Sequence, residues 1–126
     1  ESLELGPGEL LVETGDEMLF RRATLTDRVL ERLRRGEFRV EDEVDLHGLT
    51  EVEAREAVRA FIAGSLKRGL RCVRVIHGKG LRSGPRGPVL KHAVNTWLRK
   101  FDAVLAFASA RQVDGGTGAV YVLLAR

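Results

Sequence analysis

Residues 43–53 read EVDLHGLTEVE, and this run predicts a strand that passes directly into a helix. Residues 43–47 alternate between polar and apolar side chains, as a half-buried strand does, and Gly48 ends the strand. Thr50 and Glu53 then form a capping box, in which each side chain binds the other residue's backbone N–H at the start of a helix. Apolar residues follow at helical spacing as far as Gly69: Ala54, Ala57, Val58, Phe61, Ile62 and Leu66.

The remaining sequence repeats this order of a strand before a helix and then adds two strands. Residues 72–76 predict a second strand, and the loop behind it begins His77-Gly78-Lys79-Gly80. Residues 88–101 predict a second helix, because a proline suits its first turn and its apolar residues form one face. Residues 104–108 and 119–124 predict two strands of a final hairpin. The order β-α-β-α-β-β predicts an α/β fold, a two-layer sandwich of a mixed four-stranded sheet and two main helices.

Three regions follow from these patterns. Residues 1–19 predict an acidic N-terminal tail, residues 20–42 an Arg-rich helical lead-in, and residues 43–126 the main domain. The lead-in contains a short helix, which either Thr24 or Thr26 can cap.

Composition and cysteine content narrow the class of protein. A chain of 126 residues suits one domain, or one domain with an extension, and 44% hydrophobic residues supply an ordinary core. The single cysteine, Cys72, excludes a disulfide framework, fits a reducing cytoplasm and is predicted to lie in the core. No apolar run has the length of a membrane span, and no leader opens the chain, so we expect a soluble cytoplasmic protein without a membrane partner.

The charge is distributed unevenly along the chain, although the formal net charge is only +3. Residues 1–20 hold six acidic side chains and no basic one. Between Glu56 and Asp102 there are eleven basic residues and no acidic one. Such a stretch attracts polyanions, which favours nucleic acid as a partner; the alternative is a basic, well-solvated surface without a ligand.

The loops after the first two predicted strands carry the residues that suggest chemistry. Because the carboxyl ends of parallel strands lie at one edge of a sheet, His47-Gly48 and His77-Gly78 are expected to be neighbours. Asp45 and His47 project to the same side of the strand, where a carboxylate can orient an imidazole that transfers protons. Both loops lead into helix N-termini, which favour a phosphate group. The cations predicted to bind that phosphate are Lys79, Arg82 and Arg86.

Each loop also has a purely structural interpretation. Asp45 can cap a backbone turn beside a strand-end histidine, and residues 77–80 can form an ordinary strand-to-helix turn. Neither loop is a Walker or dinucleotide motif, so nucleotide hydrolysis and hydride transfer are disfavoured. The three histidines, His47, His77 and His92, match no common zinc spacing. The sequence assigns no cofactor with certainty, and Mg²⁺ bound through Asp45 and a substrate phosphate stays an open alternative.

Aromatic residues give no sign of a stacking surface. Trp97 and Phe101 lie at helical spacing and are predicted to belong to the core. Aromatic residues make up only 6% of the chain, which argues against recognition of RNA by a sheet of stacking rings.

Three motifs in this order resemble the Smr (small MutS-related) domain of the stand-alone bacterial type: VDLHG at residues 44–48, IHGKG at 76–80 and GGTGAVYV at 115–122. The resemblance runs from about Phe20 to Arg126. It implies a fold similar to the C-terminal domain of bacterial translation initiation factor three, and nuclease activity on RNA or DNA. Stand-alone relatives are linked to ribosome rescue, and relatives fused to the second bacterial MutS paralogue to DNA recombination control or to ribosomes.

Residues and resemblance together predict an endonuclease that binds nucleic acid and cleaves RNA, including messenger RNA at stalled or collided ribosomes, by histidine-based acid–base catalysis. The alternatives are an endonuclease that nicks branched or duplex DNA, and a module that binds nucleic acid or the ribosome without cutting. The predicted catalytic residues are Asp45, His47, His77 and Lys79. The predicted phosphate-binding residues are Gly48, Gly78, Gly80, Arg82 and Arg86. No residue is assigned to a metal, except Asp45 if Mg²⁺ is used.

Overall fold

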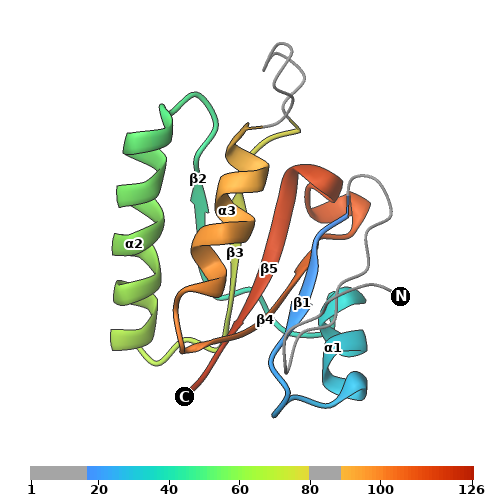
Figure 1. Ribbon diagram of the computed structural model, residues 1–126. Coiled ribbons are helices and arrows are strands. Elements are labelled where there is room, and N and C mark those ends of the chain that lie inside the picture. Colours follow the sequence, from blue (N-terminus) through green and yellow to red (C-terminus); the bar gives the residue numbers. More distant parts are fainter. Residues whose placement is uncertain (1–16, 80–88) are drawn as a thin grey trace, which may run out of the picture.

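The computed structural model describes residues 17–79 and 89–126 and shows a mixed sheet with helices on both faces (Figure 1). Its elements in chain order are β1 (Leu19–Arg21), α1 (Asp27–Arg34), β2 (Glu43–Asp45), α2 (Glu51–Lys67), β3 (Cys72–Ile76), α3 (Val89–Arg99), β4 (Val104–Ser109), η2 (Gln112–Asp114), η3 (Gly116–Gly118) and β5 (Ala119–Leu124). The last two helical labels, η2 and η3, are single 3₁₀ turns.

The sheet has the order β1-β4-β5-β3-β2, in which β2 and β3 are parallel and all other neighbours are antiparallel. The mixed α/β sheet and the final hairpin are therefore confirmed. The expected number of four strands is wrong, because residues 19–21 form a fifth strand, β1, against β4. Phe20 of this strand is buried and stacks on Phe107 at 5.1 Å between ring centroids. Three residues are too few to show a strand periodicity, so this pairing depends on a distant contact.

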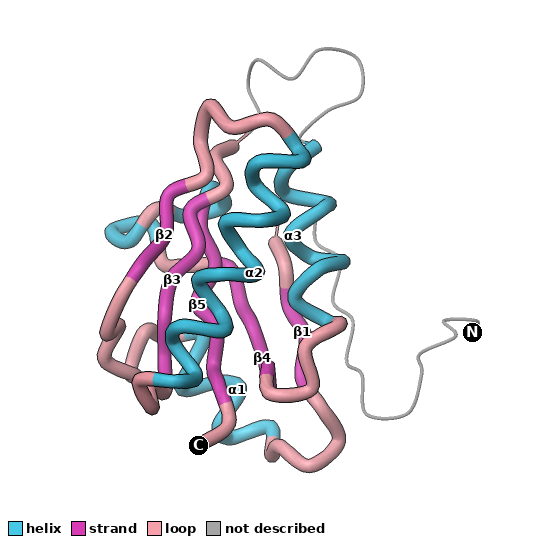
Figure 2. Tube along the Cα trace, turned by 90° about the vertical axis from the view of Figure 1, so that its left-hand side faces the viewer, coloured by secondary structure: helices cyan, strands magenta, loops and turns pink. Residues whose placement is uncertain are grey.

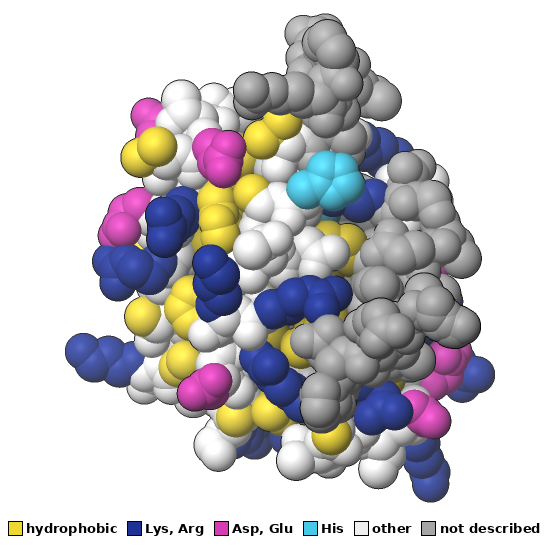
Figure 3. All heavy atoms as spheres, viewed as in Figure 1, with side chains coloured by type: hydrophobic (Ala, Val, Ile, Leu, Met, Phe, Trp, Pro, Cys, Tyr) yellow, Lys and Arg dark blue, Asp and Glu magenta, His cyan; other side chains and the backbone are white. Residues whose placement is uncertain are grey.

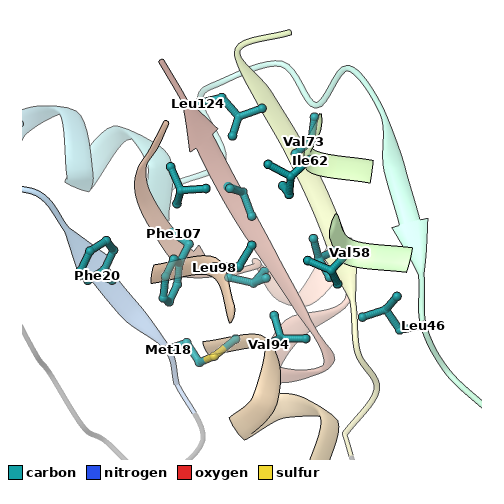
Figure 4. Close-up of a cluster of buried hydrophobic side chains, with 14 of the residues drawn as sticks. Met18, Phe20, Leu46, Val58, Ile62, Val73, Val94, Leu98, Phe107 and Leu124 are labelled. Atoms are coloured by element: carbon teal, nitrogen blue, oxygen red, sulfur yellow. The ribbon is translucent and has the colours of Figure 1, made fainter. Parts of the chain in front are cut away.

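Two cores lie on the two faces of the sheet. Helices α2 and α3 cover one face (Figure 2) and enclose the main core, part of which Figure 4 shows. Helix α1 covers part of the other face and encloses a second core with Leu30 and Leu33. Strand β5 serves both cores, since Val120 and Val122 enter the main core and Tyr121 enters the second. The predicted two layers are present, and α1 adds a small third layer.

The predicted caps and core residues take the expected places. Thr26, rather than Thr24, caps α1, and its side chain accepts a hydrogen bond from the N–H of Val29 at 3.3 Å. The capping box of Thr50 and Glu53 is formed at the start of α2. Cys72 is buried, and burial raises the pKa of its thiol to about 12, so it is an unreactive core residue. In the described part of the chain, no helix is long and apolar enough to cross a membrane.

Candidate active site

The parallel pairing of β2 and β3 brings the two His-Gly loops to one edge of the sheet. Asp45 lies opposite Ile76, and the N–H of Leu46 donates to the carbonyl of Ile76 at 2.7 Å. The start of β5 meets the same edge, where the carbonyl of Gly118 accepts the N–H groups of His77 at 3.0 Å and Gly78 at 2.9 Å. All three sequence motifs therefore meet in space; the approach of the first two was expected from the parallel strands, and that of the third was not predicted.

Asp45 and His47 form a hydrogen-bonded pair at this edge. Oδ1 of Asp45 lies 2.7 Å from Nδ1 of His47 and accepts the backbone N–H of His47 at 3.0 Å. Burial opposes ionisation of Asp45, but the hydrogen bonds from His47 outweigh it and hold the pKa of the carboxyl below its usual value. The carboxylate fixes the proton on Nδ1, and the His47 side chain is 77% exposed. Its Nε2 is therefore available to exchange a proton with a bound molecule.

Two glycines shape the loops around this pair. Gly48 has a φ of +81° and Gly78 a φ of +84°, a left-handed conformation that favours glycine over residues with a side chain. Gly118 is constrained by space rather than by its backbone conformation. A Cβ on it would lie 3.2 Å from Cγ of Lys79 and 3.4 Å from the carbonyl carbon of Gly78. The third motif thus packs directly against the second, and the Lys79 side chain begins at that contact.

His77, one of the predicted catalytic residues, is buried. Its Nδ1 donates to the carbonyl oxygen of Gly78 at 2.7 Å, and its Nε2 is buried without a partner among the described residues. Burial lowers the pKa of His77 to about 4, which the hydrogen bond to Gly78 opposes and the charge of Lys91 reinforces. His77 is therefore neutral at pH 7 and buried at the start of the second loop.

The other predicted site residues have different positions. Lys79 is exposed next to Gly118. Gly80, Arg82 and Arg86 lie outside the described residues. His92 is exposed on α3. Within residues 17–79 and 89–126, no three His, Cys, Asp or Glu side chains are grouped as metal ligands, and Oδ1 of Asp45 already accepts two hydrogen bonds.

A charged network beside the pair was not predicted from the sequence. Arg74 on β3 donates to Glu43 of β2, with Nε at 3.0 Å, and to the carbonyl of Asp114 at 3.2 Å. The carboxylate of Asp114 in turn accepts the hydroxyl of Tyr121. Asp114 lies just before the third motif, so this network links β2 to that motif. The alternating pattern of β3 places Arg74 on a sheet face, but a single sequence carries no signal of its partners.

Lys91 was also not predicted as part of the site. Its side chain is buried in α3, and its charge acts on His77. A lysine is rarely buried unless it is paired, so burial beside the second motif marks it as part of the site's structure.

The surface charge is smaller than the sequence count indicates. Among the eleven cations of the acid-poor stretch, Arg68 pairs with Asp42 at 2.7 Å, and Arg59 and Arg74 pair with Glu56 and Glu43. Lys and Arg side chains are nevertheless conspicuous on the face formed by α2 and α3 (Figure 3). Arg55 and Lys100 on this face form no ion pair with any residue that the structure describes.

The protein thus has a mixed α/β sheet that presents an exposed histidine, oriented by a carboxylate, at the edge where its glycine-containing loops meet. The sequence model of the Smr domain matches residues 44–125, and the chain belongs to the Smr domain family. The resemblance seen in the sequence is therefore confirmed.

Curated relatives carry two kinds of name. The chain is 38% identical over 105 residues to the "probable DNA endonuclease SmrA" of Escherichia coli (strain K12), covering 83% of this chain and 56% of that protein. It is 35% identical over 103 residues to the "ribosome rescue factor SmrB" of Erwinia tasmaniensis, covering 82% of this chain and 53% of that protein. The chain thus spans about half the length of these relatives.

Two solved structures confirm the fold. YdaL, a stand-alone small MutS-related protein from Escherichia coli, superposes with a TM-score of 0.77 at 36% identity, covering 87% of this chain and 84% of YdaL. The Smr domain of Thermus thermophilus MutS2 superposes with a TM-score of 0.60 at 35% identity, covering 68% of this chain and 99% of that domain. The likeness to translation initiation factor three stays a prediction.

Proposed function

We propose that this protein binds nucleic acid and cleaves its phosphodiester bonds, with RNA as the favoured substrate. The observation that carries the proposal is the exposed imidazole of His47, whose Nδ1 lies 2.7 Å from the Asp45 carboxylate at the edge where the glycine-rich loops meet. The names of the relatives support a nuclease-type activity, since one is called a probable DNA endonuclease and others ribosome rescue factors.

In this proposal His47 transfers the protons. Its Nε2 removes the proton from a ribose 2′-hydroxyl, whose oxygen attacks the adjacent phosphorus and forms a cyclic phosphate. The bond from phosphorus to the 5′-oxygen breaks, and that oxygen takes up a proton from the protonated imidazole or from water. Asp45 stabilises the imidazolium through Nδ1. Lys79 faces the charge that develops on the phosphate, where one well-placed donor changes rates by about 100-fold to 1,000-fold.

His77 is assigned a positioning role in this mechanism. Its burial and low pKa favour support of the second loop over direct proton transfer to substrate. The sequence of steps needs no metal. A magnesium ion, if one is used, would take as ligands the second carboxylate oxygen of Asp45 and the substrate phosphate, since Oδ1 is occupied by His47.

RNA is favoured over DNA because an exposed histidine base suits an internal 2′-hydroxyl nucleophile. DNA lacks this group and would require attack by water. Nicking of DNA is the second candidate, because a relative of this chain is named a probable DNA endonuclease. Messenger RNA on stalled or collided ribosomes is the proposed cellular substrate, an extension that rests on the relatives named ribosome rescue factors.

The test compares the wild type, the double variant Asp45→Ala/His47→Ala and the variant His92→Ala, which removes an exposed histidine from α3. Each is incubated with end-labelled structured RNA and with supercoiled plasmid, with and without a chelator. We expect RNA cleavage that falls by at least about 100-fold in the double variant and is unchanged in His92→Ala. Equal cleavage by wild type and double variant refutes the catalytic assignment. Cleavage of plasmid alone assigns DNA, and binding without any cleavage assigns a module that does not cut.

A further inference from the structure

A groove of about 420 Å³ lies between α2 and α3, on the outer face of the helical layer. Its lining residues come from both helices and from the end of α3: Val52, Arg55, Glu56, Val58, Arg59, Trp97, Lys100 and Phe101. The face that carries α2 and α3 shows apolar side chains among Lys and Arg side chains (Figure 3). Nothing in the mechanism proposed above uses this groove.

The groove has an apolar, aromatic floor. Trp97 and Phe101 pack against the main core and stay partly exposed, so their remaining surface lines the groove. Val52 is 81% exposed, which is unusual for a large hydrophobic residue in this chain. Exposed apolar surface of this kind, framed by polar residues, is typical of a binding site.

The walls of the groove carry positive charge. Glu56 is bonded to Arg59, with Oε1 at 3.0 Å from Nε, so these two charges largely cancel. Arg55 on α2 and Lys100 just after α3 form no ion pair with a described residue, and both line the groove. A ligand between the helices therefore meets one unneutralised cation on each wall.

One end of the groove, at Val52, lies close to the candidate active site, and the groove runs from there to Trp97 and Phe101 at the C-terminal end of α3. Val52 belongs to the first turn of α2, and that helix follows directly after the loop that holds His47. Both α2 and α3 begin at the edge where β2 and β3 end (Figure 1). A strand of nucleic acid that leaves the Asp45–His47 pair can continue along the groove.

We propose that this groove binds a single-stranded segment of nucleic acid next to the bond to be cleaved. Bases stack on Trp97 and Phe101, and the flanking phosphates bind Arg55 and Lys100, an arrangement used by proteins that hold single strands. The volume is within the range of about 300–1,000 Å³ typical of sites for single small ligands, which suits individual nucleotides rather than a duplex. This inference rests on the proposed function but concerns a different surface. An acidic protein segment would share the charge but has no base to stack.

The test uses Trp97 as a probe, because it is the only tryptophan in the chain. Its fluorescence is followed while the full chain is titrated with an oligonucleotide of twelve 2′-O-methyl uridines, which lacks the nucleophile for cleavage. We compare wild type, Arg55→Gln/Lys100→Gln and the matched control Arg28→Gln/Arg39→Gln, which removes two exposed arginines elsewhere. We expect quenching in the wild type, about tenfold weaker binding in the groove variant and less than about threefold change in the control.

The outcomes separate this inference from the proposed function. Binding that leaves Trp97 fluorescence unchanged overturns the groove, even if the protein cleaves RNA. Equal weakening in both double variants also overturns it, since only total charge would then matter. Equal quenching by poly-glutamate at the same charge concentration assigns the groove to an acidic protein partner instead. Quenching together with a failure to cleave any nucleic acid leaves the groove standing and refutes only the nuclease.

Discussion

One carboxylate oxygen of Asp45 accepts two hydrogen bonds from the same residue, His47, so a single side chain fixes both the loop and the imidazole. Asp45→Asn keeps the shape but removes the negative charge that stabilises the imidazolium. We expect its single-turnover cleavage rate to fall by about 100-fold or more while RNA affinity changes less than threefold. The matched control is Asp102→Asn, which removes an exposed carboxylate just after α3. A parallel loss of rate and affinity would mean that Asp45 acts only through binding.

His77 gives the protein a pH-dependent stability. Its pKa is about 4 in the folded protein and about 6.5 in the unfolded chain. Between these values the unfolded state binds more protons, so stability is full above pH 6.5 and falls as the pH decreases toward 4. The loss approaches about 3 kcal/mol at pH 4. His77→Asn retains a donor for the Gly78 carbonyl and should flatten this dependence. Urea unfolding at pH 7.5, 5.5 and 4.5 measures it, and identical slopes in both proteins would contradict the buried neutral state.

Some features of single site residues could be predicted from the sequence, and others could not. The contact between Asp45 and His47 was expected from their spacing, although β2 ends at Asp45 and His47 lies in the turn behind it. The approach of the second motif follows from parallel pairing. The burial of His77 and Lys91 does not follow, because it depends on tertiary contacts between different elements. Polarity patterns count residues along one element and carry no information about such a contact.

Of the strands that form the site, β2 has the least support from its neighbours. It has three residues, lies at the edge of the sheet and pairs only with β3. Arg74 connects this strand through Glu43 to Asp114, and its side chain is 21% exposed. The network therefore holds the strand that carries Asp45 against the start of the third motif.

Arg74→Gln should destabilise the pairing of β2 more than it destabilises the protein as a whole. We expect a loss of about 1–2 kcal/mol in the free energy of unfolding, since a partly buried charged network is broken. Amide exchange at Leu46, which donates to Ile76, should quicken more than exchange at residues of β5. The control Arg59→Gln breaks an exposed pair within α2 and should change stability by less than about 0.5 kcal/mol. Uniform acceleration across the sheet would assign Arg74 to global stability alone.

Elements with strong local signals were predictable, and the one without such a signal was not. Helix α2 has a capping box and a regular apolar face, so its start could be read from Thr50. Strand β1 has three residues, and its place depends on the stacking of Phe20 on Phe107, which lies far along the chain. Sequence patterns therefore predicted the α/β class correctly but could not predict the number of strands.

In the whole molecule, several cations of the basic stretch are engaged by carboxylates or aromatic rings, or are buried. Of the eleven cations between Glu56 and Asp102, three form ion pairs with carboxylates, two lie over aromatic rings and one is buried. These six are Arg59, Arg68, Arg74, Arg71, Arg99 and Lys91. Of the other five, Lys67, Lys79 and Lys100 form no ion pair with a described residue, and Arg82 and Arg86 lie outside the described residues.

Because only part of the basic stretch is free to contact phosphates, we expect nucleic-acid binding to depend moderately on salt concentration. Each phosphate contact with a single strand contributes about −0.7 to the slope of log K against log salt concentration. Eleven contacts would give a slope of about −8, whereas five give about −3.5. Titration of a 2′-O-methyl RNA oligonucleotide between 50 and 300 mM NaCl measures the slope. A value steeper than about −6 would mean that the ion pairs of Arg59, Arg68 and Arg74 open when nucleic acid binds. A value near −3.5 would mean that they persist, so that the fold, rather than the sequence count, sets the number of phosphates held.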